Sequence, residues 1–546
     1  MKKKILIGAG AVLFVLLFLF FAMPNLNPLY AEGAFLWCVV ISAVVAVLTL
    51  RGSFKLKTTT TPGGRTVIDF GGAKHPPFKR LVWVLLPWAV FVVVNVISMP
   101  LFNSDAYKNQ LTEPEEKVFS SDMQAIDVDS IPVVDKALAA KLADKKLGEK
   151  PSLGSQVVLG EPVIQTVNEK LVWVVPLYHS GLFKWVSNMD GSDGYIVVSA
   201  TNMRDVEYVE GYKIKYQPNA YLFDNLQRKI RFSGGFFTGI DDFSFELDDT
   251  GRPYWVVTTY RNSWGFSLPE ADGIILLDAQ TGETHRYGLD EIPEWVDRVQ
   301  PEDFIINQIN NMGEYVHGVF NFSNKDKFST SEGHSIVYNG GRCYLFTGLT
   351  SVGSDDSAIG FMMVDMVTKQ PYRYQIAGAT ETAAMSSAMG KVQNLKYTAS
   401  FPLIINVGGE PTYFMTLKDN EGLVKQYAFV SVEDYLIVGT GETITDALQS
   451  YETNLQSGGD TDLNFDNNQT AVLEGTVLRF ASEQKDGNTV YRMLIDTMPD
   501  VIFECPQNVS KALALTREGD SVSLTYYEGD TPLLTVSEFK NNTLGQ

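Results

Sequence analysis

Residues 170–179 read KLVWVVPLYH, and residues 252–260 read RPYWVVTTY. The two stretches share Trp-Val-Val with a tyrosine following, Tyr178 in one and Tyr260 in the other, and they align without gaps. Runs rich in β-branched and aromatic residues are typical of β-strands. The shared motif therefore predicts a body built from repeated β-rich units.

Each copy is followed by a second β-rich run, Tyr195–Ala200 or Ile274–Ala279, and weaker copies begin at Tyr344 and Tyr413. Ahead of the strand pairs, apolar residues three or four apart predict helices. These helices are expected at residues 134–147, 220–230, 301–315 and 380–389, with a fifth at 443–455. The sequence thus predicts a unit of one helix and two or more antiparallel strands, used about four times between residues 131 and 455.

The run GIILLDAQTGE, from Gly273 to Glu283, resembles the closing hairpin of PepSY-like domains. The resemblance implies small cystatin-like α+β units that are exported or membrane-tethered and take part in peptidase inhibition or in the regulation of envelope enzymes. The residues also have a simpler role, because Gly282 is free to take the positive φ that a tight hairpin turn requires.

The C-terminal part has a different order of predicted elements. Residues 456–469 are rich in Gly, Asp and Asn and predict a linker. Five strands are then expected in residues 470–546, with a short helical piece at 510–516 before the fourth, an order that resembles an OB-fold barrel. Few basic residues accompany its aromatic side chains, so the sequence favours a protein-interaction barrel over one that binds nucleic acid.

The N-terminal part contains three long apolar runs, at residues 5–23, 34–50 and 81–101. Each is long enough to span a bilayer as a helix. Basic residues precede the first run and fill the loop 51–80, so the positive-inside rule places the N-terminus in the cytoplasm and the C-terminus outside.

The fold class expected is therefore a membrane-anchored α+β protein with three N-terminal transmembrane helices, tandem α+β repeats and a C-terminal small β-barrel. Its expected parts are a transmembrane region at 1–102, a stalk at 103–130, two pairs of repeats at 131–300 and 301–455, the linker 456–469 and the barrel 470–546. The expected location is a bacterial cell membrane, crossed three times, with most of the chain extracytoplasmic.

The predicted external part carries 34 basic and 62 acidic residues, a net charge of −28. Such a surface disfavours binding to nucleic acid or to anionic lipid headgroups. Of the three cysteines, Cys343 and Cys505 fall in this external part, in different predicted domains, so no disulfide framework is expected.

The densest group of acidic residues is found between two predicted strands and comprises Asp241, Asp242, Glu246, Asp248 and Asp249. Paired carboxylates can serve glycoside hydrolysis or bind Ca²⁺. However, the alternation of Phe243, Phe245 and Leu247 with polar residues is also what a strand with one solvated face requires. No histidine or cysteine spacing of a metal site and no nucleophile motif is found, so no cofactor and no metal are expected.

Three aromatic residues in predicted loops, Trp185, Trp264 and Phe266, are the candidates for contact with a partner. The function expected is a non-catalytic, membrane-anchored scaffold or regulator of envelope proteins. A surface receptor for a ligand or peptide is one alternative and predicts an apolar pocket near Trp185 or Trp264. A surface hydrolase is the other and predicts that Asp241, Asp242 or Glu246 lines a deep cleft.

Overall fold

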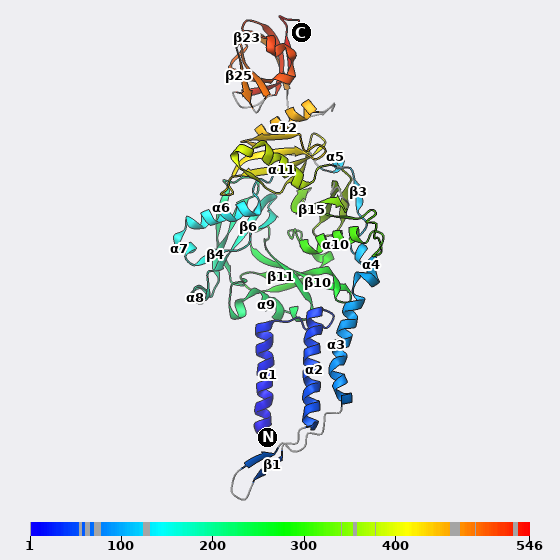
Figure 1. The fold of residues 1–546 in the computed structure, drawn as a ribbon. Helices are drawn as coiled ribbons and strands as arrows, with labels where there is room; N and C mark the ends of the chain where they lie inside the picture. The colour runs from blue at the N-terminus through cyan, green and yellow to red at the C-terminus, as the bar shows by residue number, and fades with distance from the viewer. Residues whose placement is uncertain are drawn as a thin grey trace.

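The computed structural model describes residues 2–53, 57–60, 66–69, 78–123, 131–339, 341–352, 358–376, 378–458, 470–485, 488–527 and 533–545. Helices gather at the N-terminal end of the molecule, sheets form its middle, and a small barrel stands at the C-terminal end (Figure 1). Most of the predicted linker and most of the loop 51–80 lie outside the described residues.

The N-terminal helices are α1 (Lys2–Ala22), α2 (Ala31–Ser53), α3 (Phe78–Ile97) and α4 (Pro100–Lys108). Among the described residues, only Ala31–Leu48 in α2 is by itself long and apolar enough to cross a membrane. Helix α3 meets this criterion only together with α4, across a bend of 51°, and α1 offers the shorter apolar run Ala9–Ala22. Because a bilayer core requires about 20 apolar residues in one helix, the prediction of three membrane spans is wrong.

The segment predicted as an irregular stalk contains α4, the strand β3 (Glu115–Lys117) and the short helix α5 (Phe119–Asp122). Strand β3 pairs in parallel with a strand of the third sheet, Tyr372 lying opposite Glu115. The described part of this segment is therefore built into the body, and its last residues, 124–130, lie outside the described part.

Four sheets of antiparallel strands follow one another along the chain, each entered through a helix. The first has the order β4-β6-β7-β8 and the second β12-β11-β10-β9. Their helices are α6 (Lys136–Gly148) and α9 (Leu226–Phe232), and the short α8 (Leu182–Ser187) interrupts the first sheet. Their strands are β4 (Val157–Leu159), β5 (Val163–Val167), β6 (Lys170–His179), β7 (Ser192–Ser199), β8 (Val206–Ile214), β9 (Gly239–Leu247), β10 (Pro253–Trp264), β11 (Ser267–Asp278) and β12 (Thr284–Gly288).

The third sheet has the order β13-β15-β16-β17-β3 and the fourth β18-β20-β21-β22, with β14 and β19 paired to β15 and β20. Their helices are α10 (Glu302–Glu314) and α11 (Glu381–Lys391), and α12 (Ile444–Gly458) follows. Their strands are β13 (Phe328–Thr330), β14 (Ser335–Asn339), β15 (Arg342–Ser351), β16 (Ala358–Asp365), β17 (Pro371–Tyr374), β18 (Thr398–Ala399), β19 (Leu403–Val407), β20 (Glu410–Lys418), β21 (Val424–Ser431) and β22 (Val438–Gly441).

The same backbone hydrogen bonds recur in all four units. In each, a carbonyl just after the third strand accepts from the segment that precedes the helix of that unit. The acceptors are Ala200, Ala279, Met366 and Val432, and the donors are Val133 and Val134, Lys215 and Tyr216, Val299 and Gln300, and Ala379, at 2.7–3.0 Å. The units are therefore structural repeats, including the two whose sequence similarity is weak.

Successive sheets share apolar cores, and the fourth sheet shares one with the first. These cores are illustrated by Val174 with Trp255, by Phe346 with Tyr413 and by Phe414 with Trp173. Between the second and third units, Val256 of β10 shares a core with Val299, which lies in the segment before α10. The sheets consequently form a closed ring, seen face-on in Figure 1 with β6, β10, β15 and α11 on successive sides. The four sheets have four to six strands each, and their arrangement in a ring resembles a β-propeller. The predicted class, a membrane-anchored α+β fold, is thus wrong, because the body is mostly sheet.

Residues 470–541 form a separate closed barrel in the strand order β23-β24-β25-β27-β26. Strands β25 and β27 run parallel, and the other neighbours are antiparallel. The strands are β23 (Thr470–Lys485), β24 (Asn488–Ile495), β25 (Met498–Pro506), β26 (Ser521–Tyr527) and β27 (Leu533–Asn541). All five lie at the places predicted for strands.

Candidate functional site

A cleft of about 550 Å³ lies where the first two sheets meet the N-terminal end of α10. Close to it, the hydroxyl of Tyr338 in β14 donates to the carbonyl of Ile164 in β5, at 3.3 Å, and thereby joins the third sheet to the first. The polar and aromatic residues that line the cleft are Lys136, Glu161, Tyr178, Asp241, Asp242, Phe243, Ser244, Phe245, Trp255, Arg298, Glu302 and Asp303. Five carboxylates and two cations therefore converge on one concave surface.

Asp242 occupies a β-bulge in β9. Its neighbours Asp241 and Phe243 pair with the consecutive residues Thr258 and Val257 of β10, so Asp242 has no partner of its own. Its φ is +40°, a backbone conformation that residues other than glycine adopt only at an energetic cost. Because a bulge redirects the side chain that it carries, the bulge turns the carboxylate of Asp242 toward the cleft.

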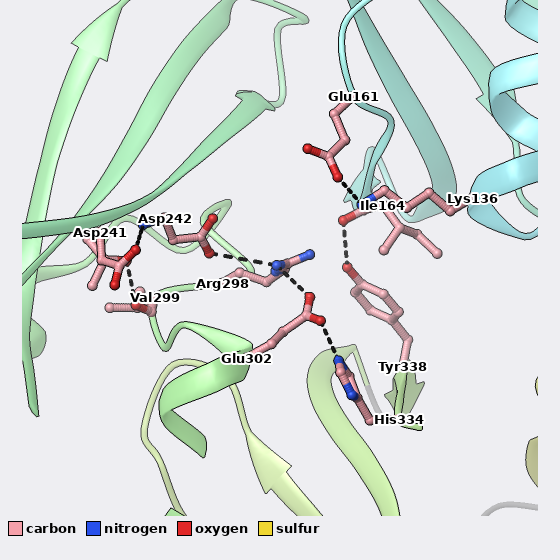
Figure 2. Close-up of polar contacts among 11 residues, drawn as sticks. Lys136, Glu161, Ile164, Asp241, Asp242, Arg298, Val299, Glu302, His334 and Tyr338 are labelled. Atoms are coloured by element: carbon pink, nitrogen blue, oxygen red, sulfur yellow. Dashed lines mark hydrogen bonds and ion pairs between the residues drawn. The ribbon is translucent and has the colours of Figure 1, made fainter. Parts of the chain in front are cut away.

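Arg298 connects a carboxylate of β9 with one at the start of α10. Its guanidinium lies 2.8 Å from Glu302, in the first turn of α10, and 3.7 Å from Asp242. Glu302 is also 2.8 Å from Nε2 of His334, which precedes β14. Figure 2 shows Arg298 between Asp242 and Glu302, with His334 on the far side of Glu302.

The pKa values of the two carboxyl groups beside Arg298 are shifted in opposite directions. Burial raises the pKa of Asp242 above its ordinary value, and the charge of Arg298 offsets only part of this effect. Burial also raises the pKa of Glu302, but the hydrogen bond to His334 and the charge of Arg298 outweigh it, so that the pKa of Glu302 is lowered. Two carboxyl groups whose environments separate their pKa values are the pattern of a general acid and its ionised partner.

A second pair of buried acids lies next to this site. Burial raises the pKa of Glu246 in β9 to about 8 and also raises the pKa of Asp297, although Asp297 accepts a hydrogen bond from the backbone of Thr166 at 2.7 Å. A side-chain hydrogen bond with Ser244 offsets only part of the effect of burial on Glu246. Glu246 is therefore protonated, and uncharged, at neutral pH.

The five acidic residues that are clustered in the sequence have different positions in the structure. Asp241 and Asp242 line the cleft, whereas Glu246 is buried beside it. Asp248 caps the β9–β10 turn, where its carboxylate accepts from the backbone of Thr250 and Arg252 at 2.9 Å. The hydrolase alternative had predicted carboxylates in a cleft, and two of its three named residues lie there.

The aromatic residues proposed as partner contacts have different surroundings. Trp185 is buried in α8, and its Nε1 donates to the carboxylate of Asp224 at 3.2 Å. Trp264 and Phe266 form the tip of the β10–β11 hairpin and contact α3 of the same chain. The Nε1 of Trp264 donates to the carbonyl of Ile97 at 3.1 Å, and the ring of Phe266 lies 5.5 Å from that of Phe91.

An apolar cavity of about 880 Å³ extends between α2 and α3 and ends at Gly265 and Phe266. It lies close to Trp264, the place where the receptor alternative predicted a pocket. Its walls come mainly from the two helices, and they include Trp37, Trp83 and Pro87.

Arg298, Glu302 and His334 were not identified as site residues from the sequence. Glu302 lies in the helix expected at residues 301–315, which the structure contains as α10, but no functional role was predicted for it. Their proximity depends on the closure of the ring, which no local pattern indicates. In the described part of the chain, no three metal-ligating side chains are grouped so that they would hold an ion.

No family model matches the chain, and no curated protein matches it. A levansucrase of B. megaterium is 8% identical over 76% of this chain and 97% of its own, with a TM-score of 0.17. A GH32 β-fructofuranosidase of Bombyx mori is 10% identical over 72% of this chain and 68% of its own, also with a TM-score of 0.17. These TM-scores are too low to indicate a shared fold or activity.

Proposed function

We propose that the protein is a hydrolase that cleaves a glycosidic bond in the cleft between its first two sheets and the start of α10. The observation that carries the proposal is the pair Asp242 and Glu302, which lie on either side of Arg298 and have pKa values shifted in opposite directions. Glycoside hydrolysis requires one carboxylic acid to protonate the leaving oxygen and one carboxylate to act on the sugar or on water. Asp242 takes the first role and Glu302 the second.

The surroundings of the pair support this assignment. Asp242 is held in a strained bulge, and strained residues cluster at sites where geometry is part of the mechanism. Tyr178 supplies aromatic surface at the wall of the cleft, and Glu161, Asp241 and Asp303 supply hydrogen-bond acceptors for hydroxyl groups. His334 and Arg298 keep Glu302 ionised.

The test is hydrolysis of a panel of aryl glycosides by the purified full chain and by its Asp242→Asn and Glu302→Gln variants. Loss of the acid or its partner is expected to lower the rate by about 10²–10⁴-fold. The matched control is Asp249→Asn, which changes an exposed acid of the same sequence cluster outside the cleft and is expected to retain full activity. If no glycoside is cleaved, or if all three variants retain activity, the proposal is wrong.

A second candidate is a scaffold or regulator of other envelope proteins, held at a membrane through α2. It is favoured by the C-terminal barrel, which stands apart from the ring in Figure 1 and exposes Val472 and Leu478. Under this reading, a stable partner would copurify with the full chain and be lost when the barrel is deleted. Such a partner, together with an inactive cleft, would favour the scaffold.

A further inference from the structure

An exposed apolar patch surrounds the end of α1. It is formed by α8 and by the segment from η2 (Leu222–Asp224) through α9 to η3 (Gly235–Phe237). Its members are Leu182, Phe183, Val186, Leu222, Phe223 and Phe237, with exposed fractions from 46% to 84%. We call these six residues the aromatic patch. Soluble surfaces rarely gather so many large apolar side chains in one place, so the patch marks an interaction site.

The two halves of the aromatic patch are fixed to each other by Trp185. Its ring lies 5.6 Å from that of Tyr221, and its Nε1 donates to Asp224, so α8 and the 221–237 segment share a buried floor. Trp185, predicted from the sequence to contact a partner, therefore supports the surface from below.

The patch is continuous with the N-terminal helices. The ring of Phe20, near the end of α1, lies 5.2 Å from that of Phe223, and Arg228 donates to the carbonyl of Phe20 at 2.9 Å. The connector from α1 to α2 is hydrogen-bonded to the same segment, from Leu26 to Phe236 at 2.6 Å. In Figure 1, α8 and α9 lie at the side of the body from which α1 and α2 project. If α2 crosses a bilayer, the patch lies at its surface.

The charge of this region differs from that of the rest of the chain. In residues 182–189 and 221–237, the basic residues that are not buried are Lys184, Arg228 and Lys229, while Arg231 and the only acid, Asp224, are buried. The external part as a whole carries a net charge of −28. Apolar side chains among basic ones are the composition of segments that insert into the headgroup layer of anionic membranes.

We infer that the aromatic patch lies on an anionic lipid bilayer and inserts its phenylalanines into the headgroup region. The body is thereby held against the membrane by its basic, aromatic face, while the remaining acidic surface is repelled from it. The overall charge, taken alone, had disfavoured contact with anionic lipid, and its local distribution reverses that expectation for this face.

The test uses the full chain reconstituted into vesicles of phosphatidylcholine with 30% phosphatidylglycerol, or of phosphatidylcholine alone. Phe223→Cys is labelled with an environment-sensitive fluorophore, and Leu436→Cys serves as the matched control, because Leu436 is 70% exposed and lies before β22, in the fourth sheet. With phosphatidylglycerol, we expect the probe at 223 to shift to shorter wavelength and to be quenched by lipids that carry a shallow spin label. The probe at 436 should remain accessible to aqueous iodide.

Two further measurements distinguish anionic lipid from other partners that could cover the aromatic patch. Lys184→Glu with Lys229→Glu should reduce the lipid quenching at 223 about five-fold or more, since each basic residue near an anionic surface favours binding by roughly that factor. Iodide quenching at 223 equal to that at 436 in both vesicle types would overturn the inference. Shielding of 223 that appears in detergent and increases with protein concentration would also overturn it, because a second copy of the chain would then cover the patch.

Discussion

The guanidinium of Arg298 lies 2.8 Å from the carboxylate of Glu302, four residues further along the chain. The pair joins the connector that leaves the second sheet to the first turn of α10, and the same guanidinium reaches back to Asp242 in β9. One buried cation thus links the second and third units at the wall of the cleft.

Replacement of Arg298 by methionine is expected to lower the free energy of unfolding by about 3 kcal/mol, because the partly buried carboxylate of Glu302 would lose its cation and Asp242 would lose a polar neighbour. Urea unfolding of the full chain measures the effect. The control is Lys136→Met, which removes an exposed ion pair with Glu161 and should cost less than about 1 kcal/mol. Equal losses in the two variants would show that Arg298 has no special structural role.

Glu246 gives the protein a characteristic pH dependence. Its pKa in the folded state is about 8, above the ordinary value that it regains on unfolding. Between these two values the folded chain holds a proton that the unfolded chain has released, so stability falls as the pH rises. The slope is at most about 1.4 kcal/mol per pH unit. Glu246→Gln should flatten the stability profile between pH 5 and 8, and an unchanged profile would contradict a neutral, buried Glu246.

Asp242→Gly should separate stability from activity. Glycine relieves the positive φ, a gain of about 1 kcal/mol that offsets much of the lost ion pair with Arg298. We therefore expect the free energy of unfolding to change by less than about 1 kcal/mol, while cleavage of glycosides is lost. Thermal unfolding and rate measurements on the same preparation check both parts. A strongly destabilised but active variant would show that the bulge serves folding alone.

Trp185→Ala and Trp264→Ala are expected to differ in their effects on stability. Trp185 is 5% exposed and hydrogen-bonded to Asp224, so its removal should cost about 3–5 kcal/mol. Trp264 is 43% exposed at a hairpin tip, and its removal should cost about 1 kcal/mol. Chemical denaturation of both variants tests the difference, and a small loss for Trp185→Ala would place that residue on the surface.

The three cysteines should be unreactive in the folded chain. Cys38, Cys343 and Cys505 are all buried and free, and burial raises the pKa of the Cys343 and Cys505 thiols well above the ordinary value. A thiol reagent at pH 8 is expected to modify none of them until denaturant is added. Rapid modification of the native chain would contradict this burial, and it would also prevent selective labelling of introduced cysteines.

The local structure was largely predictable from the sequence. Helix α10 lies within the predicted range 301–315, and α6, α9 and α11 overlap the helices expected from apolar spacing. These signals depend on neighbours in sequence and on the alternation between buried and exposed side chains. The strands that contain Trp173 and Trp255 are central in their sheets, which is why both positions are occupied by the same large side chain.

The ring was not predictable by the same reasoning. A repeated unit is compatible with a linear array or with a ring, and the choice depends on whether the last unit packs on the first. Here Phe414 and Phe429 share a core with Trp173 and Ile196. The cleft depends on this closure, so Asp241 and Asp242 were recognised only as acidic residues, and Arg298 and His334 were not recognised as site residues. The number of membrane spans was overestimated because apolar composition alone does not specify helix length or bending.

The strand β3 has a consequence for the order in which the chain can fold. It completes the edge of the third sheet beside β17, yet it is synthesised before any residue of the four repeats. A nascent chain must therefore keep residues 115–117 unpaired until residues 372–374 have left the ribosome. A fragment that starts at residue 131 would leave β17 as an open edge, and open edges recruit strands from other molecules. Expression of the ring without its helices should therefore begin before Glu115.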